Sequence, residues 1–139
     1  MAKPVAWGIL GTAAIARKCV IPAIQASPRS RIKVLGSRDL YRAKQLAAAH
    51  RIETAVQGYE AVVEDPEVEA VYIPLPNHLH QKWTLAALYA GKHVLCEKPL
   101  TMNAAQARQV QAVRDDVGGD QAPRRSTGAV LRVEEIHLS

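Results

Sequence analysis

Lys98 is the residue of this sequence best placed to move a proton. It lies in Glu97-Lys98-Pro99, directly after the apolar run His93–Cys96, which we predict to be a buried strand. Because proline has no N–H to donate to a neighbouring strand, the strand should end at this point. Open α/β sheets bind their ligands at the carboxyl ends of the strands, where a lysine is a candidate for proton transfer. A solvated surface lysine is the other interpretation of the same residues.

A second group of residues could hold the phosphates of a dinucleotide. The apolar run Val5–Leu10 leads into Gly11-Thr12-Ala13-Ala14-Ile15-Ala16, a variant of the fingerprint G-x-G-x-x-G/A. Gly11 permits a tight turn, Ala16 permits close packing of helix on strand, and the helix N-terminus offers N–H groups to a pyrophosphate. The methyl group of Ala13 narrows the approach that a second glycine would allow. An ordinary strand–turn–helix corner is the alternative, but the context favours a dinucleotide. The predicted cofactor-binding residues here are Gly11, Thr12, Ala13, Ile15 and Ala16.

The end of the next strand indicates which dinucleotide is bound. Ile32–Gly36 is followed by Ser37-Arg38-Asp39. At this place an acidic residue usually meets the ribose 2′-hydroxyl of NAD, whereas an arginine accommodates the 2′-phosphate of NADP. Ser37 can donate to a phosphate oxygen and Arg38 can pair with it, so the sequence favours NADP. NAD is the alternative, since Asp39 could hold a ribose hydroxyl instead of capping the following helix.

Polar residues also follow the strand expected at Ala70–Pro74. Two prolines, Pro74 and Pro76, hold an extended loop, and Asn77 next to them offers both hydrogen-bond donors and acceptors. His78 and His80 come next, two positions apart. A metal site would need at least one further ligand beside them, and none is evident nearby, so we predict no metal.

These residues need a sheet to bring them together. Short apolar runs alternate with helical patterns, which predicts right-handed βαβ units and an α/β fold with a doubly wound parallel sheet. The expected strands are Val5–Leu10, Ile32–Gly36, Thr54–Val56, Ala70–Pro74 and His93–Cys96. The expected helices follow Ile15 with a kink or tighter turn at Pro22, cover Tyr41–His50, run from Leu79 to Ala90 before Gly91, and follow Asn103. The carboxyl ends of parallel strands share one edge, so Gly11, Ser37, Asn77 and Lys98 should converge.

The pattern of elements changes near residue 117. Residues 1–117 are expected to form a single dinucleotide-binding domain. Residues 118–139 form an irregular C-terminal tail, because Gly118–Gly128 has the composition of a linker. Within that tail, Ala129–Leu138 is predicted to form one further strand.

Composition limits the classes of function. The chain has 139 residues, of which 48% are hydrophobic, so it can bury a core and is not a disordered chain. Its formal charge is +5, but the lysines and arginines are dispersed, which favours a small anionic ligand over nucleic acid. Two cysteines are too few to suggest a disulfide framework or a metal cage. No apolar stretch is long enough to span a membrane, so we expect no membrane partner and a cytoplasmic protein.

Taken together, these segments resemble the amino-terminal domain of the Gfo/Idh/MocA oxidoreductases, the family of glucose–fructose oxidoreductase and inositol dehydrogenase. The matching segments are Val5–Ala13, Gly36-Ser37-Arg38, Pro76–His80 and Glu97-Lys98-Pro99. The resemblance runs from about Lys3 to Val117. The opening Trp-Gly-Ile-Leu-Gly-Thr-Ala and the Ser-Arg pair look most like the NADP-dependent dihydrodiol and xylose dehydrogenase branch, in which an alanine at the position of Ala13 is familiar.

The resemblance implies a Rossmann fold and an oxidoreductase that transfers hydride between NADP(H) and a sugar-like or diol substrate. It implies that Lys98 contacts the substrate hydroxyl undergoing oxidation, and that Glu97, Pro76, Asn77 and His80 help to shape the cofactor site. Family members continue into a second domain that supplies most substrate contacts, and the residues after Val117 do not resemble it. We therefore expect a truncated chain that binds NADP but is poorly active alone. A non-catalytic NADP-binding or sensor module is the alternative, and the oligomeric state is not predicted.

Overall fold

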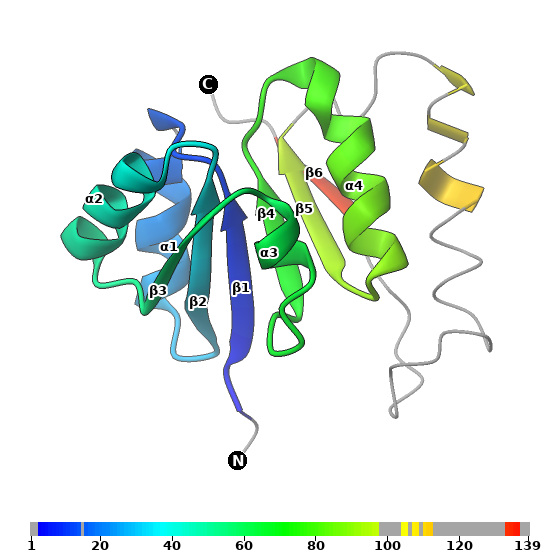
Figure 1. The fold of residues 1–139 in the computed structure, drawn as a ribbon. Coiled ribbons are helices and arrows are strands. Elements are labelled where there is room, and N and C mark those ends of the chain that lie inside the picture. Colours follow the sequence, from blue (N-terminus) through cyan, green and yellow to red (C-terminus); the bar gives the residue numbers. More distant parts are fainter. Residues whose placement is uncertain are drawn as a thin grey trace.

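A single parallel sheet organises the part of the chain that the computed structural model describes, which is residues 3–14, 16–97, 104–105, 107–108, 110–112 and 133–136. Six strands lie in the order β3-β2-β1-β4-β5-β6, and every neighbouring pair is parallel (Figure 1). They are β1 (Val5–Leu10), β2 (Ser30–Ser37), β3 (Thr54–Gln57), β4 (Ala70–Ile73), β5 (His93–Glu97) and β6 (Val133–Ile136). This is the strand order of the doubly wound dinucleotide-binding fold, so the predicted fold class is confirmed.

Helices cover both faces of this sheet (Figure 1). They are a π-helical turn η1 (Ala16–Val20), α1 (Ile21–Ala26), α2 (Leu40–His50), α3 (Glu60–Val63), a 3-10 turn η2 (Asn77–Leu79) and α4 (His80–Tyr89). The helices α1 and α2 pack on one face, and α3 and α4 pack on the other. Successive strand residues point to opposite faces, so Ile9 and Leu10 of β1 are both fully buried but belong to different core clusters. The sheet is therefore buried on both faces, and the carboxyl ends of its strands are left for ligands.

Two of the predicted helices owe their ends to identifiable caps. Asp39 begins α2, because its carboxylate accepts from the backbone N–H groups of Tyr41 (3.0 Å) and Arg42 (3.3 Å). Gly91 ends α4 with a φ of +79°, which a residue with a side chain rarely adopts. Its N–H donates to the Leu88 carbonyl, and the next N–H donates to the Ala87 carbonyl, the pattern of a Schellman motif.

The first helix departs from its prediction. Pro22 was expected to kink the helix or to mark a tighter turn, but the chain widens before it into the π-helical turn η1. Pro22 then lies in the first turn of α1, the part of a helix in which proline is tolerated. The break is at the predicted place, but the turn beside Pro22 is wider than an α-helical turn and not tighter. The short helix α3 was not predicted, since four residues are too few to show a helical period.

The later part of the chain adds one strand at the edge of the sheet. The strand β6 pairs in parallel with β5 and falls inside the predicted Ala129–Leu138 strand. The described residues between 104 and 112 are helical, as the helix expected after Asn103 requires. The proposed domain boundary at residues 117 and 118 lies outside the described residues. Among the helices that the structure describes, none is both long and apolar enough to cross a membrane.

Candidate functional site

The turn after β1 is built around Gly11. This residue has a φ of +99°, and an idealised Cβ on it would lie 3.1 Å from Cδ2 of Leu75. Its N–H donates to the carbonyl of Gly36 in β2 (2.7 Å), which ties the turn to the neighbouring strand. The positive φ favours glycine here, and the approach of the Leu75 side chain leaves little room for a Cβ. The prediction of a tight turn at Gly11 is confirmed, and the backbone is left open towards the edge of the sheet.

The residues that follow lead the chain from this turn into the first helix. Thr12 and Ala13 are half-buried, and the carbonyl of Ala13 accepts from the N–H of Arg17 (3.2 Å). Ala16 is fully buried in the core cluster beneath α1 and α2, as close packing of helix on strand requires. Ile15 lies outside the described residues.

The end of β2 presents a hydroxyl group and a guanidinium. Ser37 is buried, and its Oγ accepts from the N–H of Asp39 (3.1 Å), so the hydroxyl hydrogen is available for a ligand. Arg38 is exposed at the next position. The Oδ1 atom of Asp39 accepts from the first N–H groups of α2, and its Oδ2 atom lies 3.8 Å from Nε of Arg42. Asp39 therefore caps α2, which is one of the two roles that the sequence analysis considered for it.

The loop after β4 is held from beneath by His80. The ring of His80 is 1% exposed, and its Nε2 atom is hydrogen-bonded to the carbonyl oxygen of Leu75. Pro76 accepts from the N–H of Leu79 (2.9 Å) and is exposed, as is Asn77, the first residue of η2. The two ends of this loop are therefore fixed, and His80 contributes by holding the backbone rather than by facing solvent.

These segments meet around one cavity of about 270 Å³ at the carboxyl edge of the sheet. Its described lining is Gly11, Thr12, Ala13, Ser37, Arg38, Asp39, Arg42, Tyr59, Pro74, Leu75 and Pro76. Six of the predicted cofactor-binding residues are among them: Gly11, Thr12, Ala13, Ser37, Arg38 and Pro76. Glu97 is the last residue of β5, and neither its side chain nor Lys98 lies within the described part of the structure. Their predicted roles stay predictions.

Two polar lining residues, Tyr59 and Arg42, were missed by the sequence reasoning. Tyr59 follows Gly58, which comes directly after β3, and its ring packs edge-to-face on Trp83 with 5.2 Å between centroids. The rule that ligands gather at strand ends would have found Tyr59 if the weak strand β3 had been followed to its end. Arg42 is the third residue of α2, the helix that begins two residues after Arg38. Among the described residues, no group of three or more histidine, cysteine, aspartate or glutamate side chains could hold a metal ion.

Comparison with known proteins identifies the family of this chain. The sequence profile of the Gfo/Idh/MocA oxidoreductases, described as an oxidoreductase family with an NAD-binding Rossmann fold, matches residues 5–119. A D-xylose 1-dehydrogenase (NADP(+)) from Haloferax volcanii is 49% identical over 112 residues, which are 81% of this chain and 34% of that protein. A trans-1,2-dihydrobenzene-1,2-diol dehydrogenase from Xenopus laevis is 37% identical over 108 residues, 76% of this chain and 32% of the relative.

A solved structure shows the same arrangement of elements. KijD10, a 3-ketoreductase from Actinomadura kijaniata crystallised with NADP and TDP-benzene, matches with a TM-score of 0.80 and 42% identity. The match covers 84% of this chain and 35% of KijD10. The chain thus spans about a third of the length of the relatives it matches. With its profile match over residues 5–119, the chain belongs to the Gfo/Idh/MocA oxidoreductase family, in which it corresponds to the NAD-binding Rossmann domain.

Proposed function

We propose that this chain binds NADP(H) at the carboxyl edge of its sheet, as the cofactor-binding part of an oxidoreductase. The reaction would move hydride between NADP(H) and a hydroxyl or carbonyl group of a sugar-like or diol substrate. The observation that carries the proposal is the meeting of the Gly11 turn with Ser37 and Arg38 around one cavity. A turn without a Cβ lets phosphates approach the backbone, and the hydroxyl and guanidinium beside it suit a 2′-phosphate.

The charges around the cavity support NADP over NAD. Arg38 and Arg42 both line it, and the acidic residue among the described lining is Asp39. Asp39 has a role within the chain, because its Oδ1 atom caps α2 by accepting from two N–H groups and its Oδ2 atom lies 3.8 Å from Nε of Arg42. The relatives point the same way, because the xylose dehydrogenase is named for NADP(+) and KijD10 was crystallised with NADP.

The reaction roles follow from position in the sheet. The nicotinamide ring of a bound cofactor would supply the hydride chemistry. Lys98 follows β5 directly, so its amino group would orient the substrate hydroxyl and help to move its proton, with Glu97 and Asn77 near the cofactor. His80 would hold the loop at Leu75 in place beneath them. The alternative of a non-catalytic sensor gains no support from the comparisons, in which the relatives are named as oxidoreductases.

Cofactor titration with matched variants tests this proposal without requiring turnover. The dissociation constants of NADP and NAD are measured by calorimetry for the full chain, for Arg38→Ala and for Arg29→Ala. Arg29 precedes β2, at the opposite edge of the sheet, and is equally exposed to solvent. We expect the parent chain to prefer NADP, and Arg38→Ala to weaken NADP about tenfold while leaving NAD unchanged, as the loss of a charge-assisted hydrogen bond implies. Arg29→Ala should change neither constant.

The variant Asp39→Asn also tests the preference between NADP and NAD. It removes the charge of the side chain but keeps the helix cap, since asparagine caps a helix as well as aspartate does. Under the proposal this variant binds NADP at least as tightly as the parent chain. A loss of NAD affinity in Asp39→Asn, together with equal binding of NAD and NADP by the parent chain, would show that the acidic residue and not Arg38 selects the cofactor.

A further inference from the structure

The amino edge of the sheet, where the strands begin, lies opposite the proposed cofactor site and carries a group of basic side chains. Four of them lie at or shortly before the starts of β1, β2 and β3, and all are exposed: Lys3, Arg29, Arg31 and Arg51. Arg31 lies 3.2 Å from Oε2 of Glu53, whereas the ion pairs of the described residues include none with the other three. We call these four residues the basic patch. The proposed function leaves it without a role.

The loop that leads into β4 carries the opposite charge. Between α3 and β4 the chain has four acidic residues, Glu64, Asp65, Glu67 and Glu69, and we call this segment the acidic loop. Nζ of Lys33 lies 3.5 Å from Oδ2 of Asp65 and 3.6 Å from Oε2 of Glu67, and the buried Nζ of Lys92 donates to the Asp65 carbonyl. These two lysines offset part of the negative charge. The Glu67 side chain is still 63% exposed, so its carboxylate can be reached from outside.

The strand order sets the basic patch and the acidic loop on either side of β1. Figure 1 shows the start of β1 between the loop that enters β2 and the loop that enters β4. Both loops are tied to that start by backbone hydrogen bonds. The N–H of Val5 donates to the Arg29 carbonyl (2.8 Å), and the N–H of Glu69 donates to the Ala6 carbonyl (2.8 Å). The two groups of charge are therefore held at fixed places along one edge.

Apolar side chains lie between the two groups of charge. Val5 is 36% exposed although it begins a central strand. An exposed proline lies in each of the three segments that enter β1, β2 and β4, and these are Pro4, Pro28 and Pro66. Because proline fixes its own φ, such segments lose little backbone freedom when a partner binds. A small apolar centre with a charged rim is the usual anatomy of a protein–protein interface.

We propose that the amino edge binds a second copy of this chain, in a dimer whose two-fold axis runs perpendicular to the sheet beside the start of β1. This axis sets the loop before β2 of one protomer against the loop before β4 of its partner, so Arg29 faces the partner's Glu67, and the pair occurs twice. An axis within the plane of the sheet would set like charges against each other. The carboxyl edge stays open in this dimer, so the proposal does not depend on the proposed function.

The test reverses one charge on each side of the interface and then combines the two variants. Sedimentation equilibrium of the full chain gives the dimer dissociation constant for the parent, for Arg29→Glu, for Glu67→Lys and for an equimolar mixture of both variants. The controls Lys44→Glu on α2 and Glu60→Lys on α3 change the net charge by the same amounts at exposed positions away from the amino edge. Each sample is measured at about 20 mM and about 500 mM NaCl, because salt screens exposed charges.

We expect the parent chain to form a dimer at low salt and to return to the monomer mass at high salt. Each single variant should raise the dissociation constant about tenfold or more, and each control should change it less than about twofold. The mixture should recover the parent's association, because a mixed dimer sets each reversed residue against a native residue of opposite charge or against the other reversed residue. If Glu67→Lys does not unfold cooperatively on heating, Arg29→Glu against Lys44→Glu decides alone.

Three results would overturn the proposal. The first is a parent chain that keeps the monomer mass at low salt, and if that chain binds a short DNA duplex through Arg29, the basic patch is assigned to nucleic acid instead. The second is a mixture that associates no better than the single variants. The third is a mass that grows beyond twice the monomer, since contacts without a two-fold axis form open chains.

Discussion

Replacing Gly36 by alanine should disturb the sheet at the point where the site is held together. Gly36 lies in β2 between Leu10 of β1 and Val56 of β3. An idealised Cβ on it would lie 2.6 Å from the carbonyl oxygen of Gly58 and 2.6 Å from Cγ2 of Val62. Real Cβ atoms essentially never approach so closely, so either the turn after β3 or the helix α3 must move.

The cost of Gly36→Ala can be worked from these contacts. One added methyl group in a well-packed core costs about 1–3 kcal/mol, and an obstacle that is backbone rather than a flexible side chain favours the upper half of that range. The same turn is tied to β2 by the N–H of Gly58, which donates to the Ser37 carbonyl (2.7 Å), and loss of that bond adds about 1 kcal/mol. We therefore expect the free energy of unfolding to fall by about 3–4 kcal/mol.

Urea unfolding followed by tryptophan fluorescence measures this loss, with Gly91→Ala as the comparator. Gly91 has a φ of +79° and no atom within 4 Å of an idealised Cβ, so its alanine variant reports only the conformational cost, about 1–2 kcal/mol. Gly91→Asn should recover part of that cost, because asparagine tolerates the left-handed region, whereas Gly36→Asn should not. A Gly36→Ala variant within about 0.5 kcal/mol of the parent chain would refute the reasoning from crowding.

Two further substitutions test a buried lysine at the amino ends of β4 and β5 and a tyrosine that lines the site. Lys92 is buried and its Nζ donates to the carbonyls of Asp65 and Val68, both at 2.7 Å, so Lys92→Met should lower the free energy of unfolding by about 2–3 kcal/mol in urea. A loss below about 0.5 kcal/mol would contradict the importance of these bonds. Tyr59→Phe keeps the ring against Trp83 but removes a hydroxyl 4.0 Å from an idealised Cβ of Gly11. It should raise the NADP dissociation constant about two- to fivefold with Tm unchanged, and an unaltered constant would show that the hydroxyl does not reach the cofactor.

Much of the fold could be predicted because it depends on local patterns. Five of the six strands were expected to within one residue at their carboxyl ends, since a parallel sheet buried on both faces appears as short continuous apolar runs. Asp39 and Gly91 supplied the signals for the start of α2 and the end of α4. The short helix α3 escaped prediction because its position is set by tertiary packing of Val62 and Val63 against the sheet. The same limit applies to the π-helical turn before Pro22.

In the candidate site, too, some residues could be predicted from local patterns and others could not. Residues at or shortly after the end of a strand, such as Gly11, Ser37 and Pro76, line the cavity at the carboxyl edge, because the topology of a parallel sheet brings all such positions to one edge. Residues that reach the site from the next helix were missed, among them Arg42. Each residue turns a helix by about 100°, so the direction of such a side chain depends on where the helix starts.

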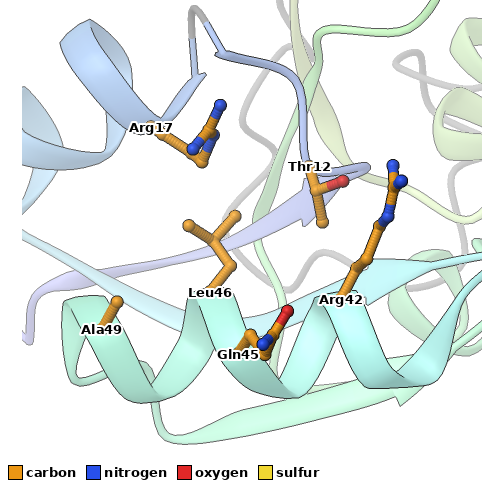
Figure 2. Close-up of a pocket in the computed structure, with 6 residues that line it drawn as sticks. All are labelled: Thr12, Arg17, Arg42, Gln45, Leu46 and Ala49. Carbon is orange, nitrogen blue, oxygen red and sulfur yellow. The ribbon is translucent and has the colours of Figure 1, made fainter.

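The starts of two helices also decide which charged side chains line a second cavity of about 390 Å³ between η1 and α2, whose described lining includes Arg17 and Arg42 (Figure 2). The cap at Asp39 sets the phase of α2 and turns Arg42 towards both cavities. On the other side, η1 has a wider turn than an α-helix, and this irregular turn carries Arg17 to the wall that faces α2. The spacing of apolar residues does not predict the direction of either arginine. The direction of Arg42 depends on the side-chain cap of α2, and that of Arg17 depends on the departure of η1 from the α-helical period. The charge that lines the second cavity is thus a property of the folded helix starts, which is where sequence patterns carry least information.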